Sequence, residues 1–240
     1  MGLLDGKVAV VTGAGRGIGR GEAIELARCG ARVVVNELDA DAGRQVVEEI
    51  AAAGGEAVLD TGDCSEEETA EHLIATALST WGRLDALVNN AGYAPLRPIR
   101  EMSVEQWRAV IDTNLSAAFY ATRAAWPAFE RQGGGVVVNV SSVSARDPFV
   151  GFAAYGAAKA GLNLFGLAAA REGERIGVRV HTVAPAAVET GMFRGLVPPD
   201  RWPAEKTLDP ADVAKVIAQC VRGELRYASG EVIYLHKTVG

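Results

Sequence analysis

The sequence predicts a doubly wound α/β fold, in which a seven-stranded parallel sheet carries helices on both faces. Short runs rich in valine alternate with longer amphipathic segments, which is the pattern of successive βα units. The runs at residues 33–35 and 136–140 are continuously apolar, as expected for strands that are covered on both faces. A glycine-dense turn joins the first strand to the first helix, a feature of Rossmann-like sheets.

Each element has a predicted place along the chain. We predict strands at residues 7–12, 31–36, 57–59, 86–89, 136–140, 178–183 and 231–234. We predict helices at residues 18–29, 41–53, 66–80, 104–132, 155–174 and 210–221. Capping residues mark three helix starts, at the pairs Ser65/Glu68 and Ser103/Gln106 and at Asp209 before Pro210. Residues 195–208 lie among several prolines and indicate a surface loop.

Length and composition limit the classes of protein. We expect 240 residues to form a single domain, residues 1–240, with a cofactor-binding half over about 1–135 and a catalytic half over about 136–240. The net charge of −6 and the absence of a basic block argue against a nucleic-acid partner. No apolar run reaches the length of a membrane span, and residues 1–7 lack the apolar core of a signal peptide. We therefore expect a cytoplasmic protein without a membrane partner.

The cysteines do not suggest a metal centre. Cys29, Cys64 and Cys220 are widely spaced, with no CxxC pair and no neighbouring histidine pattern. Isolated cysteines of this kind are usually small buried residues. We predict three reduced, buried thiols and no metal ion.

The turn after the first strand has the spacing TGxxxGxG, from Thr12 to Gly19. It does not match the GxGxxG fingerprint of the standard dinucleotide fold in any register. Glycines allow the backbone to approach phosphate groups, and the start of the following helix attracts negative charge. The turn is therefore a candidate pyrophosphate site, although a tight strand-to-helix connection would look similar.

Two nearby residues give opposite indications about the cofactor. Glu37 ends the second strand, where an acidic side chain can accept hydrogen bonds from the adenosine ribose hydroxyls and would repel a 2′-phosphate. Arg16 lies in the glycine turn and could pair with that phosphate. We give Glu37 the greater weight and predict NAD, with NADP as the alternative.

A second set of polar residues follows later strands. It comprises Asn89-Asn90-Ala91-Gly92, Asn114, Ser141-Ser142, Tyr155 and Lys159. Tyr155 and Lys159 are four residues apart, so on a helix they share one face. Oxidising an alcohol by hydride transfer requires a base for the hydroxyl proton, and a nearby ammonium and a cationic nicotinamide ring could lower the pKa of a phenol enough for that role.

Together these motifs resemble the short-chain dehydrogenase/reductase family, in its single-domain form, from end to end. The resemblance implies a catalytic set of Asn114, Ser142, Tyr155 and Lys159. Ser142 would bind the substrate oxygen, Tyr155 would exchange a proton, and Lys159 would bind the nicotinamide ribose and lower the pKa of Tyr155. The backbone carbonyl of Asn114, at a helix kink, would hold a water of the proton relay.

The same resemblance places the cofactor along the whole edge of the sheet. The implied cofactor-binding residues are Gly13, Gly15, Arg16, Gly17, Ile18, Gly19, Glu37, Asp63, Cys64, Asn90, Ala91, Gly92, Tyr155, Lys159, Pro185, Val188 and Thr190. Gly13, Gly17 and Gly19 would line the pyrophosphate, Asp63 and Cys64 would face the adenine, and Thr190 would touch the carboxamide. One departure is Ala186, where the family usually has glycine, so strained backbone is a concern there.

The implied activity is hydride transfer between a nicotinamide cofactor and a secondary alcohol or ketone. The alternatives are an NADPH-dependent carbonyl reductase and a non-catalytic dinucleotide-binding protein. Apolar residues could line a substrate pocket, namely Tyr93, Phe149, Phe152, Met192, Phe193, Leu196 and Trp202, and Arg97, Arg146 and Arg194 could reach its mouth. The resemblance also implies a dimer or homotetramer, paired through the helices at 104–132 and 155–174.

Overall fold

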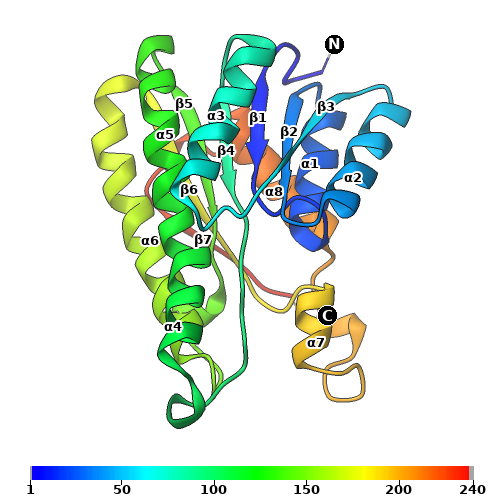
Figure 1. Cartoon of the computed structure of the whole chain (residues 1–240), viewed down its shortest axis with the longest axis vertical. Helices are drawn as coiled ribbons and strands as arrows, with labels where there is room; N and C mark the ends of the chain where they lie inside the picture. The colour runs from blue at the N-terminus through cyan, green and yellow to red at the C-terminus, as the bar shows by residue number, and fades with distance from the viewer. Residues whose placement is uncertain (1, 238–240) are drawn as a thin grey trace.

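The computed structural model describes residues 2–237, and its centre is one parallel sheet of seven strands in the order β3-β2-β1-β4-β5-β6-β7 (Figure 1). The strands are β1 (Val8–Val11), β2 (Arg32–Glu37), β3 (Glu56–Thr61), β4 (Ala86–Asn89), β5 (Gly135–Val140), β6 (Val178–Pro185) and β7 (Val232–Leu235). The predicted fold class and all seven strands are confirmed. Thr238, Val239 and Gly240, which end the sequence, lie outside the described residues.

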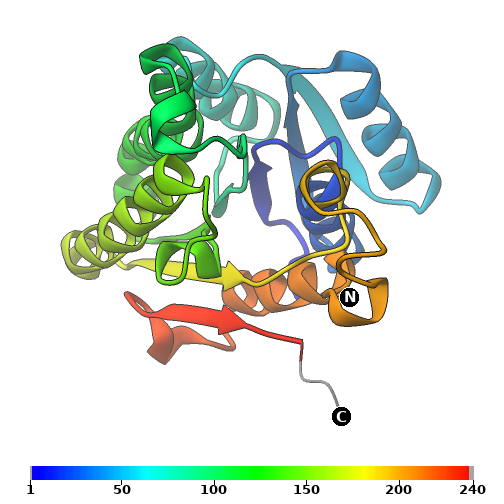
Figure 2. The same cartoon turned by 90° about the horizontal axis from the view of Figure 1, so that it is seen from below.

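Helices cover both faces of the sheet (Figure 2). They are α1 (Gly17–Arg28), α2 (Ala40–Ala52), α3 (Glu67–Trp81), α4 (Val104–Ile111), α5 (Ala117–Gln132), α6 (Ala153–Gly173), α7 (Gly191–Leu196) and α8 (Pro210–Arg222). The alternation along β2 shows the two layers, because Val33 and Val35 pack with α1, α2 and α8 while Val34 packs with α3 and α5. None of the described helices is long and apolar enough to cross a bilayer.

The predicted helix at 104–132 is divided in two by a π-helical turn, Asp112–Ser116. The side-chain amide of Asn114 donates a hydrogen bond of 2.8 Å to the carbonyl of Val110. That carbonyl is the one an α-helical backbone would use, so the side chain competes with the regular ladder and favours the wider turn. The expected kink at Asn114 is therefore present as a change of helix type.

The helix starts were predicted with mixed success. Ser103 and Gln106 form the expected capping box on α4, and Asp209 caps α8. The helix predicted at 66–80 is present as α3, but its predicted Ser65/Glu68 capping box is wrong, because Glu66 is the N-cap residue and the Ser65 hydroxyl instead donates to Asp63. Residues 195–208 were also expected to be loop, but α7 extends into them as far as Leu196.

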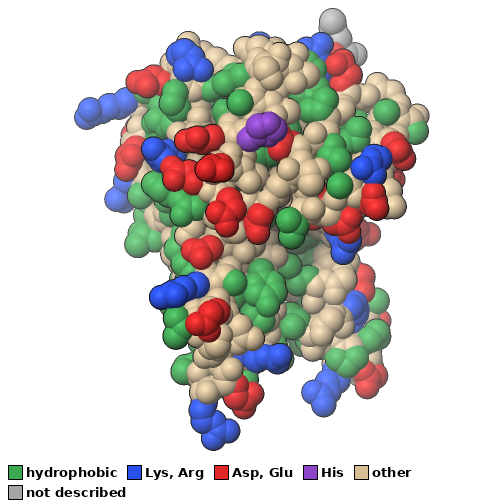
Figure 3. Space-filling view, in the orientation of Figure 1, with side chains coloured by type: hydrophobic (Ala, Val, Ile, Leu, Met, Phe, Trp, Pro, Cys, Tyr) green, Lys and Arg blue, Asp and Glu red, His purple; other side chains and the backbone are tan. Residues whose placement is uncertain are grey.

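The polar motifs lie at the carboxyl ends of the strands. β1 pairs with β2 on one side and β4 on the other, so the winding reverses there and a ligand crevice is expected beyond these strands. Two segments extend past this edge, one carrying α4 and the other α7 (Figure 1). Figure 3 shows the cleft between them.

Candidate active site

The glycine turn is held rigidly against β4. Gly13 has a φ of +62°, and a Cβ there would lie 2.9 Å from the Cα of Ala91. A Cβ on Gly19 would overlap the carbonyl of Gly13. The side-chain amide of Asn90 donates hydrogen bonds to the backbone carbonyls of Thr12 and Gly13, at 2.9 and 3.0 Å. Because Arg16 supplies no side-chain cap to α1, the turn offers a bare helix start, which suits an anionic group.

Acidic side chains surround the far side of this turn. A Glu37 carboxylate oxygen accepts a hydrogen bond of 2.9 Å from the backbone N–H of Gly15. The guanidinium of Arg16 forms an ion pair with Asp39, the N-cap residue of α2. Arg16, the one residue that favoured a 2′-phosphate, is thus already engaged by a carboxylate.

Asp63 and Cys64 follow β3 at the same edge of the sheet. The Asp63 carboxylate accepts hydrogen bonds from the backbone N–H and the hydroxyl of Ser65, at 2.9 and 2.7 Å, and so shapes the turn into α3. Burial, with the neighbouring Asp63 charge, raises the pKa of the Cys64 thiol to about 12. The thiol stays protonated at neutral pH. Cys29, Cys64 and Cys220 are all buried and free, as predicted.

Lys159 and Asn114 converge beside Gly92. The Lys159 side chain is buried and its ammonium donates a hydrogen bond of 2.8 Å to the carbonyl of Val140. A Cβ added to Gly92 would lie 3.0 Å from Asn114 Oδ1 and 3.8 Å from Lys159 Nζ. The Asn114 amide donates to the carbonyl of Tyr93 at 2.7 Å, while its oxygen is buried and has no partner within residues 2–237. A buried acceptor without a partner is a place for a bound polar group.

The two catalytic candidates on α6, Tyr155 and Lys159, lie near each other. Lys159 Nζ lies 5.6 Å from the centre of the Tyr155 ring. Burial raises the pKa of Tyr155 to about 12, and its hydrogen bond with Ser142 opposes that rise. Burial also lowers the pKa of Lys159 to about 8. The expectation that Lys159 and a cationic nicotinamide ring together lower the pKa of Tyr155 stays a prediction.

The two serines after β5 have different environments. Ser141 is buried, and its hydroxyl lies 3.3 Å from the carbonyl of Lys159. The Ser142 hydroxyl accepts a hydrogen bond of 3.1 Å from the backbone N–H of Ser144 and faces Tyr155. The spacing argument that chose Ser142 over Ser141 thus agrees with the geometry.

The segment after β6 returns to the glycine turn. The backbone N–H of Ala186 donates to Leu235, and no residue other than glycine has a positive φ among residues 2–237. The backbone strain considered for Ala186 is therefore absent. Val188 pairs with Leu208 in an isolated bridge. Thr190 caps α7, and a Cβ on Gly17 would lie 3.2 Å from its methyl group.

The candidate substrate residues divide into groups. Phe149, Phe152 and Tyr155 form a chain of rings, with centres 5.9 and 5.2 Å apart. Phe193 and Trp202 pack edge to face within the segment after β6, with centres 6.5 Å apart.

The three arginines at the predicted mouth also differ. Arg146 lies over the Tyr234 ring at 4.3 Å, and Arg97 contacts the carbonyl of its neighbour Leu96. Arg194 forms an ion pair with Glu189. Of the three, only Arg97 and Arg146 form no ion pair with a residue in the range 2–237.

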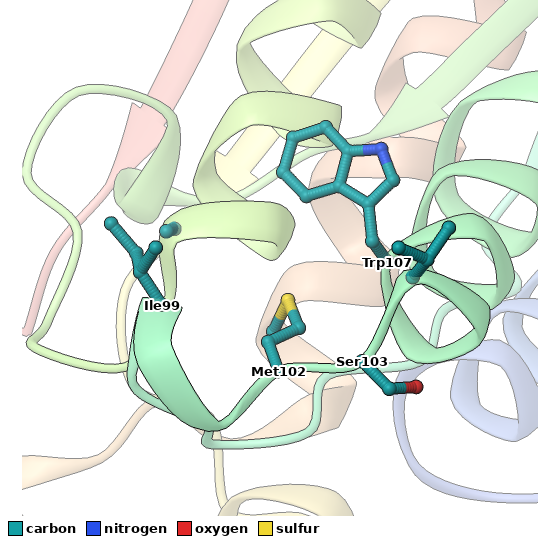
Figure 4. Close-up of a pocket in the computed structure, with 6 residues that line it drawn as sticks. Ile99, Met102, Ser103 and Trp107 are labelled. Atoms are coloured by element: carbon teal, nitrogen blue, oxygen red, sulfur yellow. The ribbon is translucent and has the colours of Figure 1, made fainter.

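An apolar hollow of about 260 Å³, which no sequence pattern predicted, lies between the starts of α4 and α6. It is lined by Ile99, Met102, Ser103, Val104, Trp107 and Ala153. Figure 4 shows Ile99, Met102 and Trp107 bordering one space. The lining contains no acid or base, so the hollow is not a second proton-transfer centre.

Known proteins are similar to this chain in sequence and in fold. Residues 7–200 match the family described as short chain dehydrogenase. The chain is 35% identical to the cyclohexanol dehydrogenase of Acinetobacter sp. (strain SE19), over 93% of this chain and 91% of that protein. It is also 35% identical to the 2,5-dichloro-2,5-cyclohexadiene-1,4-diol dehydrogenase of Sphingobium indicum, over 95% and 93% of the two chains.

A solved structure gives the same result. A 7α-hydroxysteroid dehydrogenase, complexed with NADH and 7-oxo glycochenodeoxycholic acid, superposes with a TM-score of 0.93 at 30% identity, over 98% of this chain and 94% of that one. This protein belongs to the short-chain dehydrogenase family. It is an oxidoreductase whose fold binds a nicotinamide cofactor.

Proposed function

We propose that the protein transfers a hydride between NAD(H) and a secondary alcohol or ketone, with Tyr155 as the general acid and base. One observation carries the proposal: Ser142, Tyr155, Lys159 and Asn114 lie near one another at the sheet edge where Ala91 touches the glycine turn. The bare turn and the Asn114 oxygen, which has no partner among the described residues, fit a bound dinucleotide. When bound, its nicotinamide ring supplies the hydride chemistry.

The protein side chains have separate roles in this proposal. The Ser142 hydroxyl donates a hydrogen bond to the substrate oxygen, and Tyr155 gives that oxygen a proton in reduction or takes one in oxidation. The buried Lys159 charge favours the phenolate form of Tyr155. The carbonyl of Asn114, in the π-helical turn, holds a water that passes the proton toward solvent. Titrating the protein with NADH and screening secondary alcohols tests the proposal.

NAD is the cofactor that the adenosine end of the site favours. Glu37 lies on the glycine turn and Asp39 neutralises Arg16, so a 2′-phosphate would meet two carboxylates. We predict that NADH binds at least about tenfold more tightly than NADPH, a difference of about 1.4 kcal/mol. The Glu37→Ser/Asp39→Ser variant should bind NADPH more tightly, because Arg16 is released. Tighter NADPH binding by the unmodified protein would instead favour the NADPH-dependent carbonyl reductase.

The substrate class follows from the relatives together with the aromatic chain. Two relatives are named for cyclic alcohols, cyclohexanol and a chlorinated cyclohexadienediol, and the rings of Phe149 and Phe152 extend from Tyr155. We propose apolar cyclic secondary alcohols. If Arg146 instead recognised a carboxylate, Arg146→Ala would selectively weaken turnover of carboxylated alcohols, and equal losses for neutral ones would exclude that role.

The whole chain acts in this proposal as one cytoplasmic domain that assembles as a dimer or tetramer. The exposed apolar side chains of Phe119 on α5 and Leu164 on α6, 47% and 68% accessible, support pairing through these helices. A non-catalytic dinucleotide-binding role has no comparable support, because the proposed catalytic side chains are all present.

A further inference from the structure

We propose that Glu189 and Arg194 are positioning residues, which clasp residues 189–208 into a preformed cover and hold its start against the glycine turn. The inference rests on the proposed function and adds residues to the site that carries it. Arg194, a candidate for substrate recognition on sequence grounds, is instead held by Glu189.

The clasp is a hydrogen-bonded ion pair within the cover. Arg194 donates to both carboxylate oxygens of Glu189, at 2.6 and 2.5 Å. The same guanidinium donates to the carbonyl of Trp202 at 2.7 Å, and the buried Thr207 hydroxyl donates to Glu189 at 2.9 Å. One pair therefore joins the start, the middle and the end of the segment. Two-point arginine–carboxylate contacts fix orientation as well as distance.

Backbone hydrogen bonds also join the two ends of this segment. The N–H of Glu189 donates to the carbonyl of Leu208 at 2.9 Å, and the N–H of Leu208 donates to Ala187 at 2.8 Å. The two ends of the cover are thus paired like adjacent strands. The side-chain clasp uses residues next to this pairing, Glu189 and Thr207, so the segment has a defined shape.

The clasp adjoins the residue that meets the cofactor turn. Thr190 follows Glu189, accepts a hydrogen bond from Phe193 N–H at 3.2 Å to start α7, and lies beside Gly17. Arg194 occupies the next turn of the same short helix. Breaking the pair therefore frees the contact between the cover and the glycine turn, while Ser142, Tyr155 and Lys159 keep their places.

Because the Glu189–Arg194 pair lies outside the proposed catalytic set, we expect its loss to change substrate affinity more than the rate of the chemical step. If the cover is closed for only a fraction of the time, the apparent affinity for substrate falls by that fraction. Glu189→Gln and Arg194→Gln should each raise KM for the alcohol about tenfold and change kcat by no more than about twofold. Because the two residues act as one contact, the double variant should be no worse than either single variant.

A test without turnover uses limited trypsin digestion. Arg201 and Lys206 are exposed within the cover, and an opened cover should be cut there several times faster than in the unmodified protein. Arg123→Gln is the matched control, because it breaks an exposed ion pair with Glu67 between α5 and α3. It should change neither KM nor cleavage. Thr207→Val, which removes the hydroxyl shared between Glu189 and the carbonyl of Ala204, provides a milder variant should the others fold poorly.

The outcomes separate this inference from the proposed function. Unchanged KM and unchanged cleavage in all clasp variants would overturn the inference, as would effects of the two single variants that simply add. Absence of alcohol turnover in the unmodified protein would overturn the proposed function instead. The trypsin comparison would still decide whether the clasp holds the cover.

Discussion

The buried ammonium of Lys159 sets the pH range of the proposed chemistry. Its pKa is lowered by burial to about 8, whereas the pKa of Tyr155 is raised to about 12. Ketone reduction needs a protonated Tyr155 and a charged Lys159, and the lysine charge is lost as pH rises through about 8. We predict that kcat/KM for reduction falls above about pH 8.

The control for this prediction is Lys159→Arg. A guanidinium stays charged far above pH 8, so the activity that remains in this variant should not fall there. Steady-state rates between pH 6 and pH 10 measure both profiles. A flat profile in the unmodified protein would remove Lys159 from the proposed role.

Glu22 is a second buried ionisable residue, and it lies outside the catalytic set. It is fully buried in α1, its two oxygens have no partner among the described residues, and burial raises its pKa from 4.5 to about 8. Between these two values the folded chain keeps a proton that the unfolded chain has lost. Stability should therefore fall with rising pH, by up to about 1.4 kcal/mol for each pH unit.

Glu22→Gln should remove most of this slope, because the amide does not ionise. Chemical unfolding at pH 5 and pH 8 measures it, with Glu25→Gln on the same helix as the control. The Glu25 carboxylate is hydrogen-bonded to Arg28 and has a lowered pKa, so it should not alter the slope in this range. A parallel pH dependence of the unmodified protein and Glu22→Gln would contradict the assignment.

Among the elements, α4 offers a direct test of local stabilisation. The Ser103 hydroxyl accepts from the backbone N–H of Gln106, and the Gln106 side chain accepts from the N–H of Ser103. Ser103→Ala should destabilise the protein by about 1 kcal/mol, the usual cost of losing such a cap, with little effect on NADH binding. Ser65→Ala is the comparison, because Ser65 does not cap α3. Equal losses in both variants would refute the distinction.

The elements also show which features could be predicted from sequence. The strands were found because their valine runs are set by burial on both faces, and α1 was found from its glycine start. The π-helical turn was not foreseen as such, because it depends on the Asn114 side chain capturing the Val110 carbonyl. The true start of α3 depends on Asp63 attracting Ser65.

The site itself was predictable where spacing along one element fixes geometry. Tyr155 and Lys159 share a face of α6, and Ser142 lies beside Tyr155. The engagement of Arg16 by Asp39 was not predictable, because this pair forms only when the turns after β1 and β2 come together. The engagement of Arg194 by Glu189 depends on how α7 folds against the residues just before it. Sequence patterns thus predicted the proposed catalytic residues, but not the ion pairs that Arg16 and Arg194 form.

At the scale of the whole molecule, α5 and α6 present an apolar surface. Phe119 packs edge to face against Phe165, with ring centres 6.3 Å apart, and remains 47% accessible. We predict that Phe119→Glu/Leu164→Glu lowers the mass measured by light scattering, because charges are costly in such an interface. Leu3→Glu, at another exposed leucine, should not. An unchanged mass in the double variant would contradict pairing through these helices.

The whole arrangement places a nucleotide turn, a proton-transfer set and a clasped cover at one edge of one sheet. The most direct test of its central claim is to compare Tyr155→Phe with the unmodified protein, measuring NADH binding by fluorescence and turnover of a secondary alcohol on the same samples. We predict that NADH binding is kept and turnover falls by at least about a thousandfold, within the range expected for losing an acid or base. Turnover within about tenfold of the unmodified protein would contradict the assignment of Tyr155.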